Sequence, residues 1–118
     1  MEEKKLAMVL LFDFYGDLLT EKQREYFDLY YNEDLSLSEI AQNVGITRQG
    51  VRDIIVRAEN TLLDAEKKTG LIDRYLKRDA VIGRADALAS RIEELSPADS
   101  EIRSLAVDLR GVLSELKN

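Results

Sequence analysis

The fold is decided by residues 36–58, which read SLSEIAQNVGITRQGVRDIIVRA. Ser36 with Glu39 three residues later is the capping-box pattern that starts a helix. Gly45 suits the left-handed backbone that ends a helix, and Thr47 suits the N-cap of the next one. The stretch therefore predicts two helices joined by a tight turn.

These two helices fit the helix-turn-helix motif. Their crossing needs a small residue, which Ala41 supplies four residues before the turn glycine. Apolar residues must then lock the helices together, and five residues occupy those places: Ile40, Val44, Ile46, Val51 and Ile54. A 3.6-residue apolar period continues to about Thr69, which predicts a long second helix. We predict a helix-turn-helix motif over 36–58 within a domain of residues 1–70.

Two further helices are expected before the motif. Residues 4–15 form a helix with a wide apolar face, which we expect to end at Gly16 as its C-cap residue. Thr20 and Gln23 form a second capping box, which starts the next helix. That helix has an aromatic stripe of four residues: Tyr26, Phe27, Tyr30 and Tyr31. We assign the stripe to the core, because acidic residues follow it and a base-stacking platform needs basic ones.

Residues 71–118 are predicted to form a C-terminal helical hairpin. A long helix runs to Leu95, and Ser96-Pro97 breaks it, a pair that suits the N-cap and first residue of the next helix. The last helix has apolar residues at alternating spacings of three and four: Ile102, Leu105, Leu109, Val112 and Leu116. The hairpin either extends the core or dimerises. The predicted fold class is all-α.

The composition argues against an enzyme. The 118 residues include no cysteine and no histidine, which removes the usual metal ligands, nucleophile and general base. Acidic pairs such as Glu93 with Glu94 are explained by solvated helix faces. We expect no catalytic residue, no cofactor and no metal site. The apolar run of residues 6–12 is too short to cross a bilayer, so we expect a cytoplasmic location without membrane insertion.

The charge is unusual for a protein that binds DNA, which normally presents a basic face. The net charge is −6, and residues 1–70 contain 9 basic and 14 acidic side chains, against 8 and 9 in residues 71–118. A local patch can still suffice. Side chains at the start of the second motif helix read base edges in DNA-binding versions of the motif. The candidate nucleic-acid-binding residues are Thr47, Arg48, Gln49, Arg52 and Arg57, and the alternative is a solvated helix face.

Three segments resemble region 4 of the bacterial sigma-70 factors, which recognises the promoter −35 element. They are residues 19–25 (LTEKQRE), 35–41 (LSLSEIA) and 44–48 (VGITR). The resemblance implies a sigma region 4-like helix-turn-helix domain and a sequence-specific DNA-binding regulator. Gly50 and Asp53 stand where those factors often have Arg and Gln.

Over nearly its whole length the chain resembles the YlxM-like family of small bacterial proteins. The resemblance rests on residues 8–16 (MVLLFDFYG), on LLT at 18–20 with Gln23, and on Tyr30-Tyr31 and 35–53. It implies a gene neighbouring that of the signal recognition particle GTPase, and an accessory or regulatory role in co-translational targeting. The partners expected on this basis are the GTPase or its RNA, with DNA as the alternative.

A homodimer is also expected. The wide apolar face of residues 6–15 and the seam of residues 102–116 together exceed what one short chain can bury.

Overall fold

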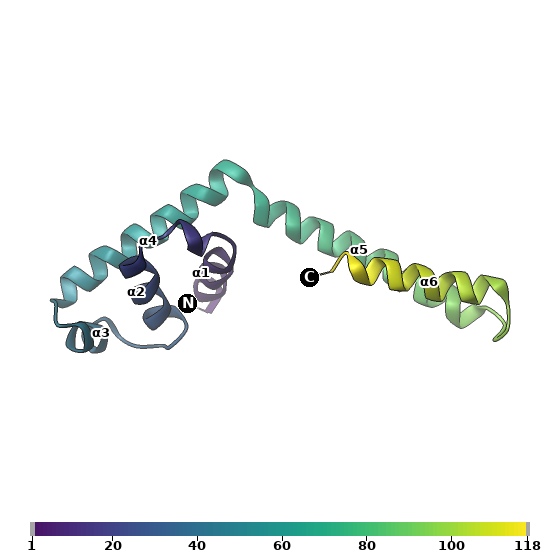
Figure 1. Cartoon of the computed structure of the whole chain (residues 1–118), viewed down its shortest axis with the longest axis horizontal. Helices are drawn as coiled ribbons and strands as arrows, with labels where there is room; N and C mark the ends of the chain where they lie inside the picture. The colour runs from purple at the N-terminus through teal and green to yellow at the C-terminus, as the bar shows by residue number, and fades with distance from the viewer. Residues whose placement is uncertain (1, 118) are drawn as a thin grey trace. The chain divides into compact units, whose positions relative to one another are not determined.

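The computed structural model describes residues 2–117, and all the regular secondary structure in this range is helical (Figure 1). The elements are α1 (Glu2–Tyr15), a 3₁₀ turn η1 (Gly16–Leu18), α2 (Glu21–Tyr31), α3 (Leu37–Val44), α4 (Arg48–Thr69), α5 (Leu71–Leu95) and α6 (Glu101–Glu115). The all-α prediction is confirmed. The chain divides into two compact units, the first ending at Ile72 and the second beginning at Asp73.

Helix α4 is the centre of the first unit, and α1, α2 and α3 all pack against it (Figure 1). Its apolar stripe is buried at every turn: Val51, Ile55, Ala58 and Leu62. From α2, Phe27 is completely buried and stacks on Phe12 of α1 with ring centroids 4.9 Å apart. The aromatic stripe of α2 therefore belongs to the core, where Tyr26 and Tyr31 are also buried.

Three of the predicted helix starts, at Thr20, Ser36 and Thr47, are present in the structure. The Thr20 hydroxyl accepts the N–H of Gln23, and the Gln23 side chain accepts the N–H of Thr20, which completes a capping box. Gly70 ends α4 with φ 63°, a left-handed conformation that costs glycine little. The chain then enters α5 directly.

The end of α1 differs from the expectation. The helix ends at Tyr15, but Gly16 does not take the left-handed conformation of a C-cap glycine; it begins the 3₁₀ turn η1 instead. A Cβ at Gly16 would lie 3.6 Å from the ring of Phe12, an ordinary contact. Gly16 is buried because the chain turns back over Phe12 at this point.

A polar contact lies at the C-terminal end of the first unit. The Tyr15 hydroxyl donates to Glu66 Oε1 at 2.6 Å, and the same oxygen accepts the N–H of Ile72 at 3.0 Å. One carboxylate of α4 thus joins α1 to the first turn of α5.

The second unit is a hairpin of α5 and α6, which run antiparallel (Figure 1). The helix break at Ser96-Pro97 is present, but the prediction that these two residues start α6 was wrong. Ser100 is the N-cap of α6, where its hydroxyl accepts the N–H of Arg103 at 3.2 Å. The Pro97 carbonyl instead accepts from Ser100, which closes a turn.

The two apolar surfaces expected from the sequence, on residues 6–15 and 102–116, differ in how far they are buried. The first unit buries Met8, Leu11 and Tyr15 of α1 and leaves Leu6 exposed, so most of that face is core. The seam of α6 stays open. Among residues 2–117, no helix combines the length and apolarity that crossing a bilayer requires.

Candidate nucleic-acid interface

Caps at three positions define the helix-turn-helix unit. The Ser36 hydroxyl accepts the N–H of Glu39 at 3.1 Å, and the Glu39 carboxylate accepts the N–H of Ser36 at 2.9 Å. These hydrogen bonds to Ser36, the one from its backbone first, lower the pKa of Glu39. Gly45 ends α3 with φ 77°. The Thr47 hydroxyl accepts the N–H of Gly50 at 3.0 Å and so starts α4.

The two helices are locked by the residues that the motif predicts, with one exception. Ile40 and Val51 are completely buried, and Ala41 is 8% exposed at the contact of α3 with α4. Val44 and Ile54 are half-buried against this core. Ile46 is 40% exposed, so its assignment to the lock was wrong. Because Ile46 lies in the turn itself, it covers the start of α4 rather than the core.

The five candidate side chains all lie exposed on α4 or at its N-cap: Thr47, Arg48, Gln49, Arg52 and Arg57. Arg48 and Arg52 are four residues apart and share one stripe of the helix. Gln49 lies about 100° around the axis from Arg48, and Arg57 lies about 180° from it. The structure therefore leaves all five residues exposed, but it spreads the three arginines over about 180° of the helix, with Arg48 and Arg57 on opposite sides.

Two of the five side chains already have partners. The Thr47 hydroxyl is used as the helix cap, and Gln49 Nε2 donates to Asp53 Oδ1 at 3.0 Å. A base contact by Gln49 would have to replace its bond to Asp53.

The arginines of α4 form a local positive region. Within residues 2–117, Arg48, Arg52 and Arg57 have no ion-pair partner. Residues 47–57 contain these three arginines and Asp53 as the only acid, a formal charge of +2 in a chain of net charge −6. This segment of α4 is therefore suited to a phosphate-bearing partner, although the whole chain is acidic.

Gly50 leaves a place on the same helix without a side chain. A Cβ there would lie 3.1 Å from Thr47 Oγ1 and 3.4 Å from Ile46 Cδ1. A larger residue at position 50 would therefore push on the N-cap of α4.

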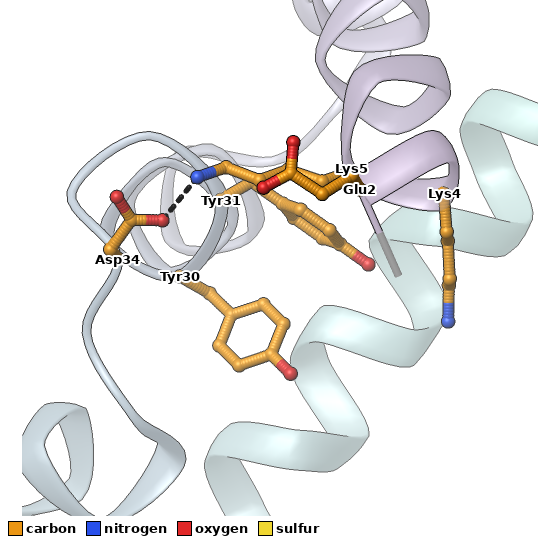
Figure 2. Close-up of a pocket in the computed structure, with 6 residues that line it drawn as sticks. All are labelled: Glu2, Lys4, Lys5, Tyr30, Tyr31 and Asp34. Carbon is orange, nitrogen blue, oxygen red and sulfur yellow. Dashed lines mark hydrogen bonds and ion pairs between the residues drawn. The ribbon is translucent and has the colours of Figure 1, made fainter.

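A cavity of about 320 Å³ lies on the same unit, between the start of α1 and the end of α2 (Figure 2). Six residues line it: Glu2, Lys4, Lys5, Tyr30, Tyr31 and Asp34. Its Lys5 is paired with Asp34, as Figure 2 shows. Asp34 has φ 59°, a left-handed conformation that aspartate tolerates better than most residues.

The cavity was not predicted from the sequence, because the aromatic stripe that includes Tyr30 and Tyr31 was assigned to the core. The Tyr31 hydroxyl donates to Glu59 of α4. Burial, and next the hydrogen bond to Glu59, raise the pKa of Tyr31 well above its ordinary value. With one lysine and one tyrosine hydroxyl already bonded, the cavity is a weaker candidate for an anionic ligand than the face of α4.

The chain matches a family model over residues 2–100, described as "Putative helix-turn-helix protein, YlxM / p13 like". The matched range includes the whole of the helix-turn-helix unit and α5.

Curated relatives belong to the same family. A UPF0122 protein of Thermoanaerobacter sp. (strain X514) is 40% identical over 118 residues, which are 98% of each chain. One from Anoxybacillus flavithermus (strain DSM 21510 / WK1) is 42% identical over 109 residues, 92% of this chain and 96% of the relative. A third, from Bacillus cereus (strain AH187), is 43% identical over 96 residues, 81% and 87% of the two chains. The protein is therefore a member of the UPF0122 family of YlxM / p13-like helix-turn-helix proteins.

Proposed function

We propose that this protein is a non-catalytic, cytoplasmic accessory factor of the signal recognition particle pathway, which contacts the particle through the exposed face of α4. The observation that carries the contact is the local charge of +2 on residues 47–57, where Arg48, Arg52 and Arg57 lack ion-pair partners within the described residues. The pathway itself comes from the resemblance to the YlxM-like family.

The chemistry of the face suits an RNA backbone. Arginine presents a planar fork of donors that matches phosphate oxygens. Three cations on one helix give weak affinity that depends on salt, and the net charge of −6 weakens attraction to phosphate elsewhere. Because the arginines alone bind weakly, a stable complex needs further contacts to the same partner. A particle made of an RNA and a GTPase can provide them.

A second candidate function is a sequence-specific transcriptional regulator. It is favoured by the position of Arg48, Gln49 and Arg52 in the first turns of α4, the part of a recognition helix that reads base edges. Arg bonds guanine and Gln bonds adenine through paired hydrogen bonds. The Asp53 carboxylate beside Gln49 weighs against it, because it occupies the Gln49 amide and repels phosphate.

The two functions are separated by fluorescence anisotropy at matched salt. The protein is titrated against the labelled particle RNA, the labelled GTPase and a pool of random DNA duplexes that is sequenced after selection. The accessory function predicts saturable binding to the RNA or the GTPase and weak, sequence-indifferent binding to DNA. An enriched DNA sequence, bound without affinity for either particle component, would overturn it in favour of the regulator.

A homodimer is part of the proposal. A second copy doubles the cations available to one partner, which raises the affinity of an otherwise weak site through effective concentration.

A further inference from the structure

The contact between α5 and α6 is small and partly polar. Three small or medium residues are buried in it: Ile82, Ala89 and Ala106. Beside this apolar contact, Arg110 of α6 donates to Asp86 at 3.1 Å and to Glu93 at 3.5 Å, both on α5. The hairpin thus closes on Ile82 and two alanines and leaves most of its other large aliphatic residues exposed.

Those large residues form a separate stripe on each helix. On α5 the stripe has alternating spacings of four and three: Val81, Ala85, Leu88, Ile92 and Leu95. On α6 and its C-cap the spacings alternate three and four: Ile102, Leu105, Leu109, Val112 and Leu116. Both are heptad patterns of the kind that packs helices together. All members except Ala85 are between 46% and 69% exposed.

The two stripes lie on the same side of the hairpin. Each stripe precedes the buried contact by one residue, as Leu88 precedes Ala89 and Leu105 precedes Ala106. One residue is about 100° around a helix. Because the helices are antiparallel, the two rotations have opposite hands in space and bring both stripes to one face, which we call the open face.

The open face is large enough for a stable dimer. A large aliphatic side chain that is about half exposed presents on the order of 100 Å², so the nine on this face present roughly 900 Å². Each partner in a standard interface buries about 800 Å². Monomeric proteins rarely expose contiguous apolar patches beyond a few hundred Å².

Charges of opposite sign border the open face on its two outer edges. The charged residues just before the heptad positions are Arg84, Arg91 and Glu94 on α5 and Glu101, Asp108 and Glu115 on α6. Four of them, Arg84, Arg91, Asp108 and Glu115, repeat at an interval of seven residues and so share one heptad position. All four are exposed. Arg91 has only the neighbouring Glu94, 3.1 Å away on its own helix, and the other three have no ion-pair partner within residues 2–117. One edge of the face is therefore basic and the other acidic.

The register of the hairpin aligns these charges. Arg110 reaches both Asp86 and Glu93, so it lies level with the residues midway between them, and Arg103 reaches the carbonyl of Ser96. In this register Arg91 is level with Asp108, and Arg84 is level with Glu115. A two-fold axis parallel to the helices keeps every residue at its own height, so the same levels apply between two copies.

We infer that two copies of this chain pair through their open faces into an antiparallel four-helix bundle, with α5 of each copy beside α6 of the other. The eighteen large aliphatic side chains of the two faces fill its core, and Arg84 and Arg91 of one copy meet Glu115 and Asp108 of the second copy. This gives the homodimer proposed above a defined surface, and it does not depend on what α4 binds.

A second copy fits this face better than an unrelated helix for a specific reason. In an antiparallel pair, the residues that precede the heptad positions face one another across the contact. The basic edge of α5 then meets the acidic edge of α6 at two matched heights, whereas α5 beside α5 would set arginine against arginine. The chain is self-complementary, as a two-fold interface requires.

The first test compares substitutions on and off the stripes by sedimentation equilibrium of the full chain at about 50 μM, far above the micromolar Kd that an interface of this size reaches. The parent protein should be a dimer. Leu88→Glu and Leu109→Glu place a charge in the bundle core and should give monomers. Leu76→Glu and Val107→Glu are matched controls, since both residues are about half exposed but lie off the stripes, and both should remain dimeric. A monomeric parent, or controls that dissociate as the stripe variants do, would overturn the inference.

The second test reverses the edges without touching the core. Arg84→Glu with Arg91→Glu should weaken the dimer about tenfold or more, because four attractive pairs become repulsive, and Asp108→Arg with Glu115→Arg should do the same. An equimolar mixture of the two double variants should restore a dimer, since every contact in the mixed dimer joins opposite charges. Failure of the mixture to dimerise, with both variants helical by circular dichroism, would exclude this arrangement. All these variants keep Arg48, Arg52 and Arg57, so loss of the dimer and loss of ligand binding are measured separately.

Discussion

Arg110 Nε of α6 lies 3.1 Å from Asp86 Oδ1 of α5, and the same guanidinium reaches Glu93 at 3.5 Å. Asp86, and after it Glu93, raise the pKa of Arg110. Because the apolar contact between the two helices is small, this ion pair is a principal link that keeps α6 against α5. We expect Arg110→Ala to increase amide hydrogen exchange across residues 101–115 while the first unit stays protected. Arg78→Ala removes an exposed arginine elsewhere on α5 and should leave exchange unchanged; equal protection of α6 in both variants would contradict the role of Arg110.

Glu39 makes the stability of the helix-turn-helix unit depend on pH. Its folded-state pKa is lowered by the hydrogen bonds to Ser36, so its charge contributes stability above the ordinary pKa of glutamate, and this is lost as the pH falls through the folded value. In Glu39→Gln the amide can keep the capping bond without the charge, as Gln23 does in α2. The parent should therefore lose more stability than Glu39→Gln between about pH 7 and about pH 3. Urea unfolding at the two pH values measures this difference. Gln23→Glu introduces a carboxylate at the equivalent position of α2, so this variant should lose more stability than the parent over the same pH range.

Tyr31 makes the stability of the first unit fall as the pH rises in the alkaline range, whereas Glu39 makes it fall as the pH drops. Burial first, and then Glu59, raise its pKa, so the folded state favours the neutral hydroxyl. This contribution is complete below the ordinary tyrosine pKa of about 10 and is lost as the pH rises above it. Tyr31→Phe should cost about 1 kcal/mol at neutral pH through the lost hydrogen bond, and the difference from the parent should narrow above about pH 10. Tyr30→Phe is the control, and an equal pH dependence in both variants would contradict this account.

Replacing glycine by alanine should lower the stability at Gly45 and raise it at Gly111. Gly45 ends α3 with φ 77°, so Gly45→Ala should destabilise the first unit by about 1–2 kcal/mol. Gly111 lies inside α6, and a Cβ there would meet nothing within 4 Å. Gly111→Ala should therefore stabilise α6 by about 0.5–1 kcal/mol. Thermal unfolding by circular dichroism compares them; a neutral Gly45→Ala would mean that the turn adjusts.

Local hydrogen bonding explains why most helix bounds could be predicted from the sequence. Thr20, Ser36 and Thr47 were identified as caps, and each accepts the backbone N–H three residues on. Prediction failed where tertiary contacts decide. Gly16 begins a 3₁₀ turn over Phe12 rather than capping α1, and Ser100 displaces Ser96 as the start of α6.

The open face shows a further limit of reasoning from periodicity alone. The heptad spacing of α6 was visible, but a stripe that packs on its own hairpin partner and one that stays exposed have the same pattern. The burial of Ile82, Ala89 and Ala106 shows that the hairpin closes on other residues, and the bonds of Arg110 and Arg103 set its register. The five candidate residues of α4 were identified from the motif, and the bond between Gln49 and Asp53 required the side-chain geometry.

The central claim, that the arginines of α4 contact the signal recognition particle, is tested most directly by the salt dependence of binding to the particle RNA. The parent should show a slope of log affinity against log salt of roughly −3 per bound chain, one for each arginine. Arg48→Ala, Arg52→Ala and Arg57→Ala together should bring the slope near zero. The matched control, Lys22→Ala, Lys67→Ala and Arg78→Ala, removes the same charge from exposed positions elsewhere and should keep the parent slope. Equal slopes in both triple variants, or no saturable binding of the parent to the RNA or the GTPase, would contradict the claim.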